Sequence, residues 1–168
     1  MNQEFEKFLL EVTNAAGCEQ KDVIQSLWSG YGKIARFKLL GSKLETVVVK
    51  HIALNQSGSH PRGWNTDLSH QRKIKSYQVE THWYKQWNEQ CSELSRTAKF
   101  LGAFTQEDEQ WIVLEDLDAV FPVRKQQLNL DEIKTCLRWL ANFHARFLNR
   151  KPEGLWEVGT YWHLDTRP

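Results

Sequence analysis

The sequence predicts an α+β fold in which five strands form one antiparallel sheet. The first observation is that the hydrophobic period changes along the chain, from helical spacing to strand alternation and back again. The second is the order of the segments: a helix, three strands, a long helix, two strands, a connector and a final helix. With 168 residues, 40% of them hydrophobic, the chain is long enough to bury one core.

The first half of the chain is expected to form a helix and a three-stranded meander. Apolar residues with helical spacing, beginning at Phe5, predict a helix over residues 3–16 that Gly17 ends. Turn residues then separate three strand patterns, at residues 23–28, 33–40 and 44–54.

The composition of residues 55–68 predicts a loop. The second predicted helix follows, with Asp67 or Ser69 as its cap, and continues to about residue 90. Two further strands are expected at residues 96–105 and 110–117.

The last predicted helix begins at Asn129, because Glu132 follows three residues later as in a capping box, and Pro152 ends it. Its apolar stripe consists of Ile133, Cys136, Leu137, Leu140, Ala141, Phe147 and Leu148. His144 lies on this stripe and is expected to be a hydrogen-bonded core histidine.

Composition excludes several classes of function. The 22 Lys and Arg residues nearly balance 21 Asp and Glu residues, so nucleic acid and anionic membranes are not expected as partners. No apolar run approaches the roughly 20 residues of a membrane span, and the N-terminus lacks the basic region of a signal peptide. Cys18, Cys91 and Cys136 are odd in number and widely spaced, which indicates reduced, buried thiols in a cytoplasmic protein. The histidines show no spacing typical of a metal site.

Lys50 is the most informative single residue. It ends a run of β-branched residues, where its ammonium would be partly desolvated, and an unpaired buried charge costs about 3–5 kcal/mol. Glu80 is the expected partner, because helical spacing puts it on one face with Tyr77 and Tyr84. Taken alone, the pair is either a structural link between helix and sheet or part of a binding site.

Five segments follow one another along the chain, at residues 26–32, 47–50, 76–80, 112–117 and 139–147. In this order they resemble the nucleotide loop, lysine strand, glutamate helix, hinge strand and first C-lobe helix of the kinase-like phosphotransferases. The resemblance is closest to the branch with ecdysteroid kinase-like, choline kinase and aminoglycoside phosphotransferase proteins. The resemblance implies a protein-kinase-like N-lobe over residues 1–118, a connector at 119–128 and the beginning of a helical C-lobe at 129–168.

The resemblance also implies roles for individual residues in binding ATP and Mg²⁺ for transfer of a phosphoryl group to an alcohol. The expected phosphate-binding residues are Ser29, Gly30, Gly32, Lys50 and Glu80. The expected adenine pocket consists of Ile34, Val48, Leu114, Glu115, Asp116 and Leu117. Arg62 and Trp64 are candidates for a lid over the nucleotide.

The chain departs from the family pattern after the last predicted helix. The catalytic and metal-binding aspartates of the family follow that helix, and only residues 151–168 remain here. His163-Leu164-Asp165 superficially copies the catalytic His-x-Asp sequence without its supporting Asn. We therefore expect no catalytic residue and no Mg²⁺ ligand in this chain, which looks like a truncated N-terminal part that is inactive alone.

Alternatives stay open for these features. The two glycines are also typical of an ordinary hairpin turn, and residues 115–118 of a solvated strand end. The tryptophans at positions 83, 87 and 139 favour packing over sugar stacking. The chain as a whole is the ATP-binding part of a small-molecule kinase, a non-catalytic nucleotide-binding module, or a scaffold that uses the fold without nucleotide. Self-association is expected through apolar surface near Trp156, Tyr161 and Trp162.

Overall fold

The computed structural model describes residues 2–27, 30–54 and 67–158 of the chain. Contacts divide the protein into two compact units. We call Met1–Tyr77 together with Phe100–Asp116 the sheet unit, and Gln78–Lys99 together with Leu117–Pro168 the helical unit. Each is described by itself, and the domain boundaries predicted near residues 118 and 128 stay a prediction.

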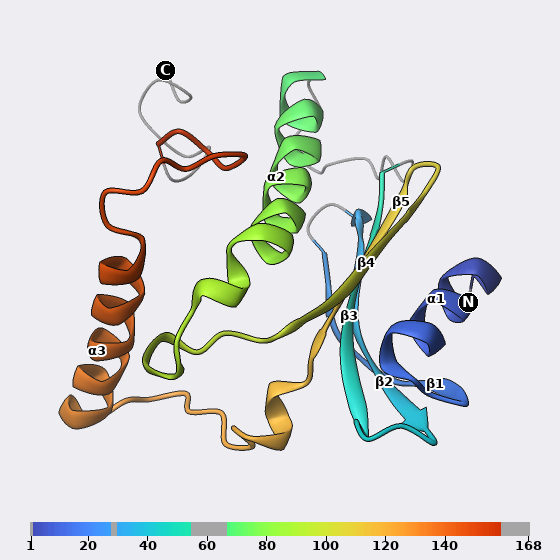
Figure 1. Ribbon diagram of the computed structural model, residues 1–168, viewed down its shortest axis with the longest axis horizontal. Coiled ribbons are helices and arrows are strands. Elements are labelled where there is room, and N and C mark those ends of the chain that lie inside the picture. The colour runs from blue at the N-terminus through green and yellow to red at the C-terminus, as the bar shows by residue number, and fades with distance from the viewer. Residues whose placement is uncertain (1, 28–29, 55–66, 159–168) are drawn as a thin grey trace. The chain divides into compact units, whose positions relative to one another are not determined.

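The sheet unit contains a five-stranded antiparallel sheet in the order β1-β2-β3-β5-β4 (Figure 1). Its strands are β1 (Gly17–Ser26), β2 (Gly32–Leu40), β3 (Thr46–Ala53), β4 (Phe100–Gln106) and β5 (Glu109–Glu115). The predicted α+β class with one five-stranded antiparallel sheet is therefore confirmed.

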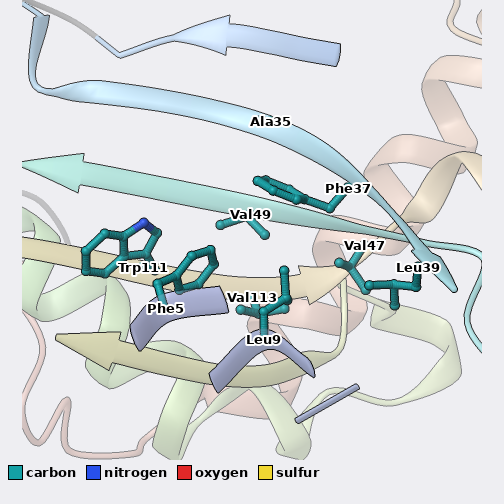
Figure 2. Close-up of a cluster of buried hydrophobic side chains, with 9 residues drawn as sticks. All are labelled: Phe5, Leu9, Ala35, Phe37, Leu39, Val47, Val49, Trp111 and Val113. Atoms are coloured by element: carbon teal, nitrogen blue, oxygen red, sulfur yellow. The ribbon is translucent and has the colours of Figure 1, made fainter. Parts of the chain in front are cut away.

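One face of this sheet forms the core with α1 (Gln3–Thr13), as Figure 2 shows. The helix contributes Phe5 and Leu9, which are almost completely buried, and the ring of Phe5 stacks on Trp111 at a centroid distance of 5.0 Å. The sheet contributes alternate residues of its inner strands, namely Ala35, Phe37, Leu39, Val47, Val49, Trp111 and Val113. Strand alternation thus sends the intervening residues to the opposite face.

The end of α1 and the start of β1 differ from the prediction. Asn14, not Gly17, ends the helix, because it adopts the left-handed conformation with φ of 47° and its N–H caps the last turn. The N–H of Ala16 then donates to the carbonyl of Leu40 at 2.7 Å, so strand pairing begins at Gly17. The first six residues of β1 were missed because most of its side chains are polar and exposed, which removes the hydrophobic alternation.

The helical unit begins within α2 (Asp67–Gln86), whose first part belongs to the sheet unit. The predicted continuation of this helix to residue 90 is wrong in detail, because α2 ends at Gln86 and a short 3-10 turn, η2 (Asn88–Gln90), follows. The described part of the unit also contains the 3-10 turns η3 (Glu93–Ser95) and η4 (Leu117–Ala119). The strand expected from residue 96 begins only at Phe100, in the sheet unit.

The last helix, α3 (Leu130–Phe147), begins as predicted. The side chain of Asn129 accepts hydrogen bonds from the N–H groups of Asp131 and Glu132, and the Glu132 carboxylate accepts one from the Asn129 N–H. The predicted packing of the tryptophans is confirmed, since Trp83, Trp87 and Trp139 lie against phenylalanine rings of α3.

Burial on α3 differs from the prediction. Its described residues include none that is buried, and Leu137 on the apolar stripe is 58% exposed. Cys136 and His144 are exposed as well, so neither is the core residue that the stripe predicted. Cys18 and Cys91 are only partly buried. A helical pattern identifies an amphipathic helix, but whether a partner covers its apolar face depends on the rest of the fold.

Candidate functional site

Lys50 lies in the middle of the sheet, on the face opposite the core. Val47 and Val49 point into the core and are 0% and 1% exposed, whereas Val48 and Lys50 belong to the other face and are half-buried. Lys50 is opposite Ile34 of β2 on one side and Ile112 of β5 on the other. Its aliphatic stem is therefore flanked by apolar neighbours, which is the partly desolvated setting that the sequence predicted.

The ammonium of Lys50 lies over an aromatic ring of α2. Its Nζ is 5.1 Å from the centroid of the Tyr77 ring, within the range of a cation–π interaction. Tyr77 therefore helps to orient the lysine side chain along the sheet toward α2. Sequence reasoning placed Tyr77 on the same helical face as Glu80 and assigned it no role of its own.

Glu80 comes one helical turn after Tyr77 in α2. Tyr77 is the last residue of its segment of the sheet unit, and Glu80 belongs to the helical unit. The Lys50–Glu80 pair therefore stays a prediction, as do the roles of both residues in binding phosphate.

The turn between β1 and β2 requires glycine. Gly30 and Gly32 have φ of 75° and 133°, in the region that other residues rarely adopt. A Cβ on Gly32 would lie 2.0 Å from the carbonyl oxygen of His51, so no other residue fits there. The N–H of Leu27 donates to the carbonyl of Gly32 at 2.8 Å and closes the turn. Gly30 has open space around its Cα, and Ser29 lies outside the described residues.

Three of the predicted adenine residues share the face of Lys50. Val48 is opposite Leu114 of β5, Ile34 is opposite Lys50, and all three apolar side chains are half-buried. Because residues opposite each other in an antiparallel pair point to the same side, these side chains form a continuous apolar strip beside the lysine. The sheet thus has an apolar surface next to an ammonium group, although its role in binding adenine stays a prediction.

The end of β5 contains an ion pair that sequence reasoning missed. The Asp116 side chain is 5% exposed, and its Oδ2 accepts hydrogen bonds from Arg36 Nε at 2.6 Å and from Thr46 Oγ1 at 2.7 Å. Arg36 also donates to Asp22 at 3.0 Å. The alternative of a solvated strand end is therefore wrong for Asp116. A sequence signal did exist, since Arg36 stands between two core residues of β2.

Of the remaining predicted site residues, one lies in the sheet unit, one lies in the helical unit and the others lie outside the described residues. Glu115 ends β5 and Leu117 begins η4 in the helical unit, so a pocket that includes both stays a prediction. Arg62 and Trp64 of the predicted lid lie outside the described residues, as do the sequence His163-Leu164-Asp165 and the predicted contact residues Tyr161 and Trp162.

Over residues 2–27, 30–54 and 67–158, no three His, Cys, Asp or Glu side chains come together as metal ligands. Within the same ranges, no helix combines the length and apolarity that crossing a membrane requires.

Comparison with known proteins identifies the family. A sequence model described as "Ecdysteroid kinase-like family" matches residues 43–153, which is more than half of the chain and includes Lys50, Glu80 and the end of β5. The chain belongs to the ecdysteroid kinase-like family. The predicted resemblance to kinase-like proteins is thereby confirmed.

Among solved structures, the chain is similar to WbdD in a co-crystal structure with the kinase inhibitor LY294002. The two share 13% sequence identity with a TM-score of 0.40, over 79% of this chain and 35% of the other. This chain thus spans about a third of the length of that protein. No curated protein matches the chain.

Proposed function

We propose that this chain is the ATP-binding part of a phosphotransferase that transfers the γ-phosphoryl group of ATP to an alcohol. The observation that carries the proposal is Lys50, a half-buried lysine in the middle of the sheet, between apolar residues and within the segment that matches a kinase-like family. A fixed ammonium beside an apolar strip suits a ligand with an aromatic base at one end and phosphates at the other.

The phosphates and the adenine ring of the nucleotide each have matching residues in this chain. Lys50 would hold the α- and β-phosphates by charge, with Glu80 keeping the side chain extended. Gly30 leaves the backbone of the turn open to close approach, since nothing lies within 4 Å of the place where a Cβ would be. The strip of Ile34, Val48 and Leu114 would pack against the adenine ring.

The residues fit ATP better than they fit Mg²⁺. In the part of the chain that the structure describes, no set of three possible metal ligands gathers, and Asp116, a carboxylate at the end of β5, is bound by Arg36 and Thr46. We therefore derive no step through a metal from this chain. The acceptor is an alcohol of unassigned structure, and the ecdysteroid named in the family description belongs to that class of compound.

The decisive experiment is a titration of the protein with MgATP, read as the rise in thermal midpoint. A ligand at 100 times its Kd stabilises the folded state by about 2.7 kcal/mol, which moves the midpoint measurably. Lys50→Met keeps the length of the side chain and removes the charge, so it should abolish the shift. Lys38→Ala is the matched control, because Lys38 is an exposed lysine of the same sheet.

Three results distinguish the alternatives. A shift in the wild type and in Lys38→Ala but not in Lys50→Met supports nucleotide binding through Lys50. An equal shift in all three proteins contradicts the role of Lys50. No shift in the wild type overturns nucleotide binding by this chain and favours the scaffold alternative.

A further inference from the structure

The residue between the two glycines of the β1–β2 turn is a buried tyrosine. Tyr31 is only 4% exposed, although Gly30 next to it is exposed. Its carbonyl accepts a hydrogen bond from the N–H of Ala53, the last residue of β3, at 2.8 Å. The turn is therefore attached to the sheet through its backbone, and the Tyr31 side chain is directed away from solvent.

The side chain of Tyr31 joins the turn to α2. Its hydroxyl forms a hydrogen bond of 2.8 Å with Nδ1 of His70, and the two rings are 5.8 Å apart between centroids. The ring also lies 6.5 Å from that of Tyr77. His70 and Tyr77 are seven residues apart in α2, so Tyr31 contacts one face of the helix over two turns.

Two ammonium groups lie over this pair of tyrosine rings. Lys73 Nζ is 4.6 Å from the centroid of Tyr31, and Lys50 Nζ is 5.1 Å from the centroid of Tyr77. Burial lowers the pKa of Lys73, which agrees with an ammonium held against a ring and partly removed from water. The turn thus contacts α2 through a hydrogen bond to His70, through aromatic rings and through the ammonium of Lys73.

We propose that Tyr31 is a positioning residue that fixes the β1–β2 turn to α2, so that the turn and the two lysines respond to a phosphate group as one unit. This inference rests on the proposed function for its link to ATP. The contacts themselves are independent of it. Without the Tyr31 hydroxyl, the ring contacts and the backbone hydrogen bonds of the turn remain, and the hydrogen bond between the turn and His70 of α2 is lost.

The first test is amide hydrogen exchange of the whole chain with Tyr31→Phe. This variant keeps the ring and removes only the hydroxyl, whose net contribution of about 1 kcal/mol corresponds to a change of about fivefold. We expect the amides of Leu27 and Ala53, which report on the turn, and those of residues 70–77 of α2 to exchange about fivefold faster together. Tyr84→Phe is the matched control, since it removes a partly buried hydroxyl from the same helix outside the sheet unit.

The pattern of exchange decides the inference. Faster exchange in the turn alone, or in α2 alone, shows that Tyr31 does not couple them and overturns it. The same acceleration in Tyr84→Phe also overturns it, because the effect is then a general loosening of α2.

The second test compares the affinities for MgATP and for adenosine. Tyr31→Phe should weaken MgATP about fivefold and leave adenosine unchanged, because the turn and the lysines address only the phosphates. In a His70→Phe background, Tyr31→Phe should have little further effect, since the partner of the hydroxyl is already gone. An equal loss for both ligands, or additive losses in the double variant, contradicts the positioning role. A wild type that binds neither ligand refutes the proposed function, and hydrogen exchange then still decides the coupling.

Discussion

The two amphipathic helices of this protein, α1 and α3, have similar sequence patterns and different surroundings. In the sheet unit, α1 buries Phe5 and Leu9 against the inner strands β2, β3 and β5, and both side chains are almost inaccessible to water. In the helical unit, α3 contacts its neighbours mainly through Trp139, Phe143 and Phe147. Within the described part of the chain it leaves the stripe around Leu137 exposed.

This difference shows that the hydrophobic pattern of a helix predicts a buried face only where another element of the fold packs against that face. The sheet supplies that cover for α1. The free energy of unfolding should therefore depend mainly on the sheet unit, and side chains of the same type should contribute unequally in the two helices.

The largest expected effect comes from one substitution made in both helices. Leu9→Ala removes a fully buried side chain and should lower the free energy of unfolding by about 2–5 kcal/mol, through lost burial and the resulting cavity. Leu137→Ala, at 58% exposure, should change it by no more than about 0.5 kcal/mol. Urea unfolding followed by circular dichroism measures both. Similar losses in the two variants would mean that the Leu137 face is covered in solution, and the comparison would then be wrong.

A second pair of variants compares two aspartates on either side of the unit boundary. Asp116→Asn weakens a buried pair in which Arg36 is 13% exposed, and should lower stability by about 2–3 kcal/mol, because hydrogen bonds to charged groups contribute this much. Asp22 remains as a second partner for Arg36 and limits the loss.

Asp118→Asn is the matched control in the helical unit. Its partner Arg124 is 68% exposed, and surface pairs contribute about 0–1 kcal/mol. Urea unfolding of the two variants should rank them in this order, and an Asp118→Asn loss equal to that of Asp116→Asn would contradict the difference between the units.

The comparison also explains what the sequence could predict. The run of β-branched residues that ends at Lys50 predicted β3, and Asn129 with Glu132 predicted the start of α3, because both are local patterns. The end of α1 at Asn14 was missed, since a left-handed asparagine has no strong sequence signal next to a nearby glycine. Exposure of α3 was missed because it depends on what the rest of the fold covers.

In the candidate site, too, local features could be predicted from the sequence and contacts between distant residues could not. Lys50 could be predicted from its strand, and its half-buried setting was found as expected. The contacts of Tyr31 with His70 and Lys73 join residues about forty positions apart, and the Arg36–Asp116 pair joins residues eighty apart. A local pattern can show that a charged residue such as Arg36 stands between core residues, but it does not identify the partner. Such pairs require the register of the sheet and the position of α2.

A third prediction concerns the caps of the two helices. Asn2 accepts hydrogen bonds from the N–H groups of Glu4 and Phe5 and donates to Gln106 of β4. Within the described residues, the side chain of Asn129 bonds to N–H groups of its own helix. Replacing either by alanine should cost about 1 kcal/mol. Asn2→Ala should lower the stability of the whole sheet unit, and Asn129→Ala should loosen only α3. Hydrogen exchange distinguishes the two, and slower or unchanged exchange in α3 of Asn129→Ala would contradict the prediction.

The smallest expected effect is a pH dependence that arises in the sheet unit alone. Burial lowers the pKa of His51, which stacks on Trp111 at 4.8 Å, and this outweighs the nearby Glu109 carboxylate, which acts to raise the pKa. As pH falls through the ordinary value of about 6.5, the unfolded chain therefore takes up a proton before the folded protein does. Stability contributed by neutral His51 is complete above that pH and declines below it until the folded protein is protonated as well.

His51→Gln removes this titration, so its free energy of unfolding should fall less steeply than that of the wild type below pH 6.5. His144→Gln is the control in the helical unit, because His144 is exposed on α3. Its stability should follow the wild-type pH curve. If His144→Gln flattened the dependence of the free energy of unfolding on pH and His51→Gln did not, α3 would be the pH-sensitive element. The prediction that the pH dependence arises in the sheet unit would then be wrong.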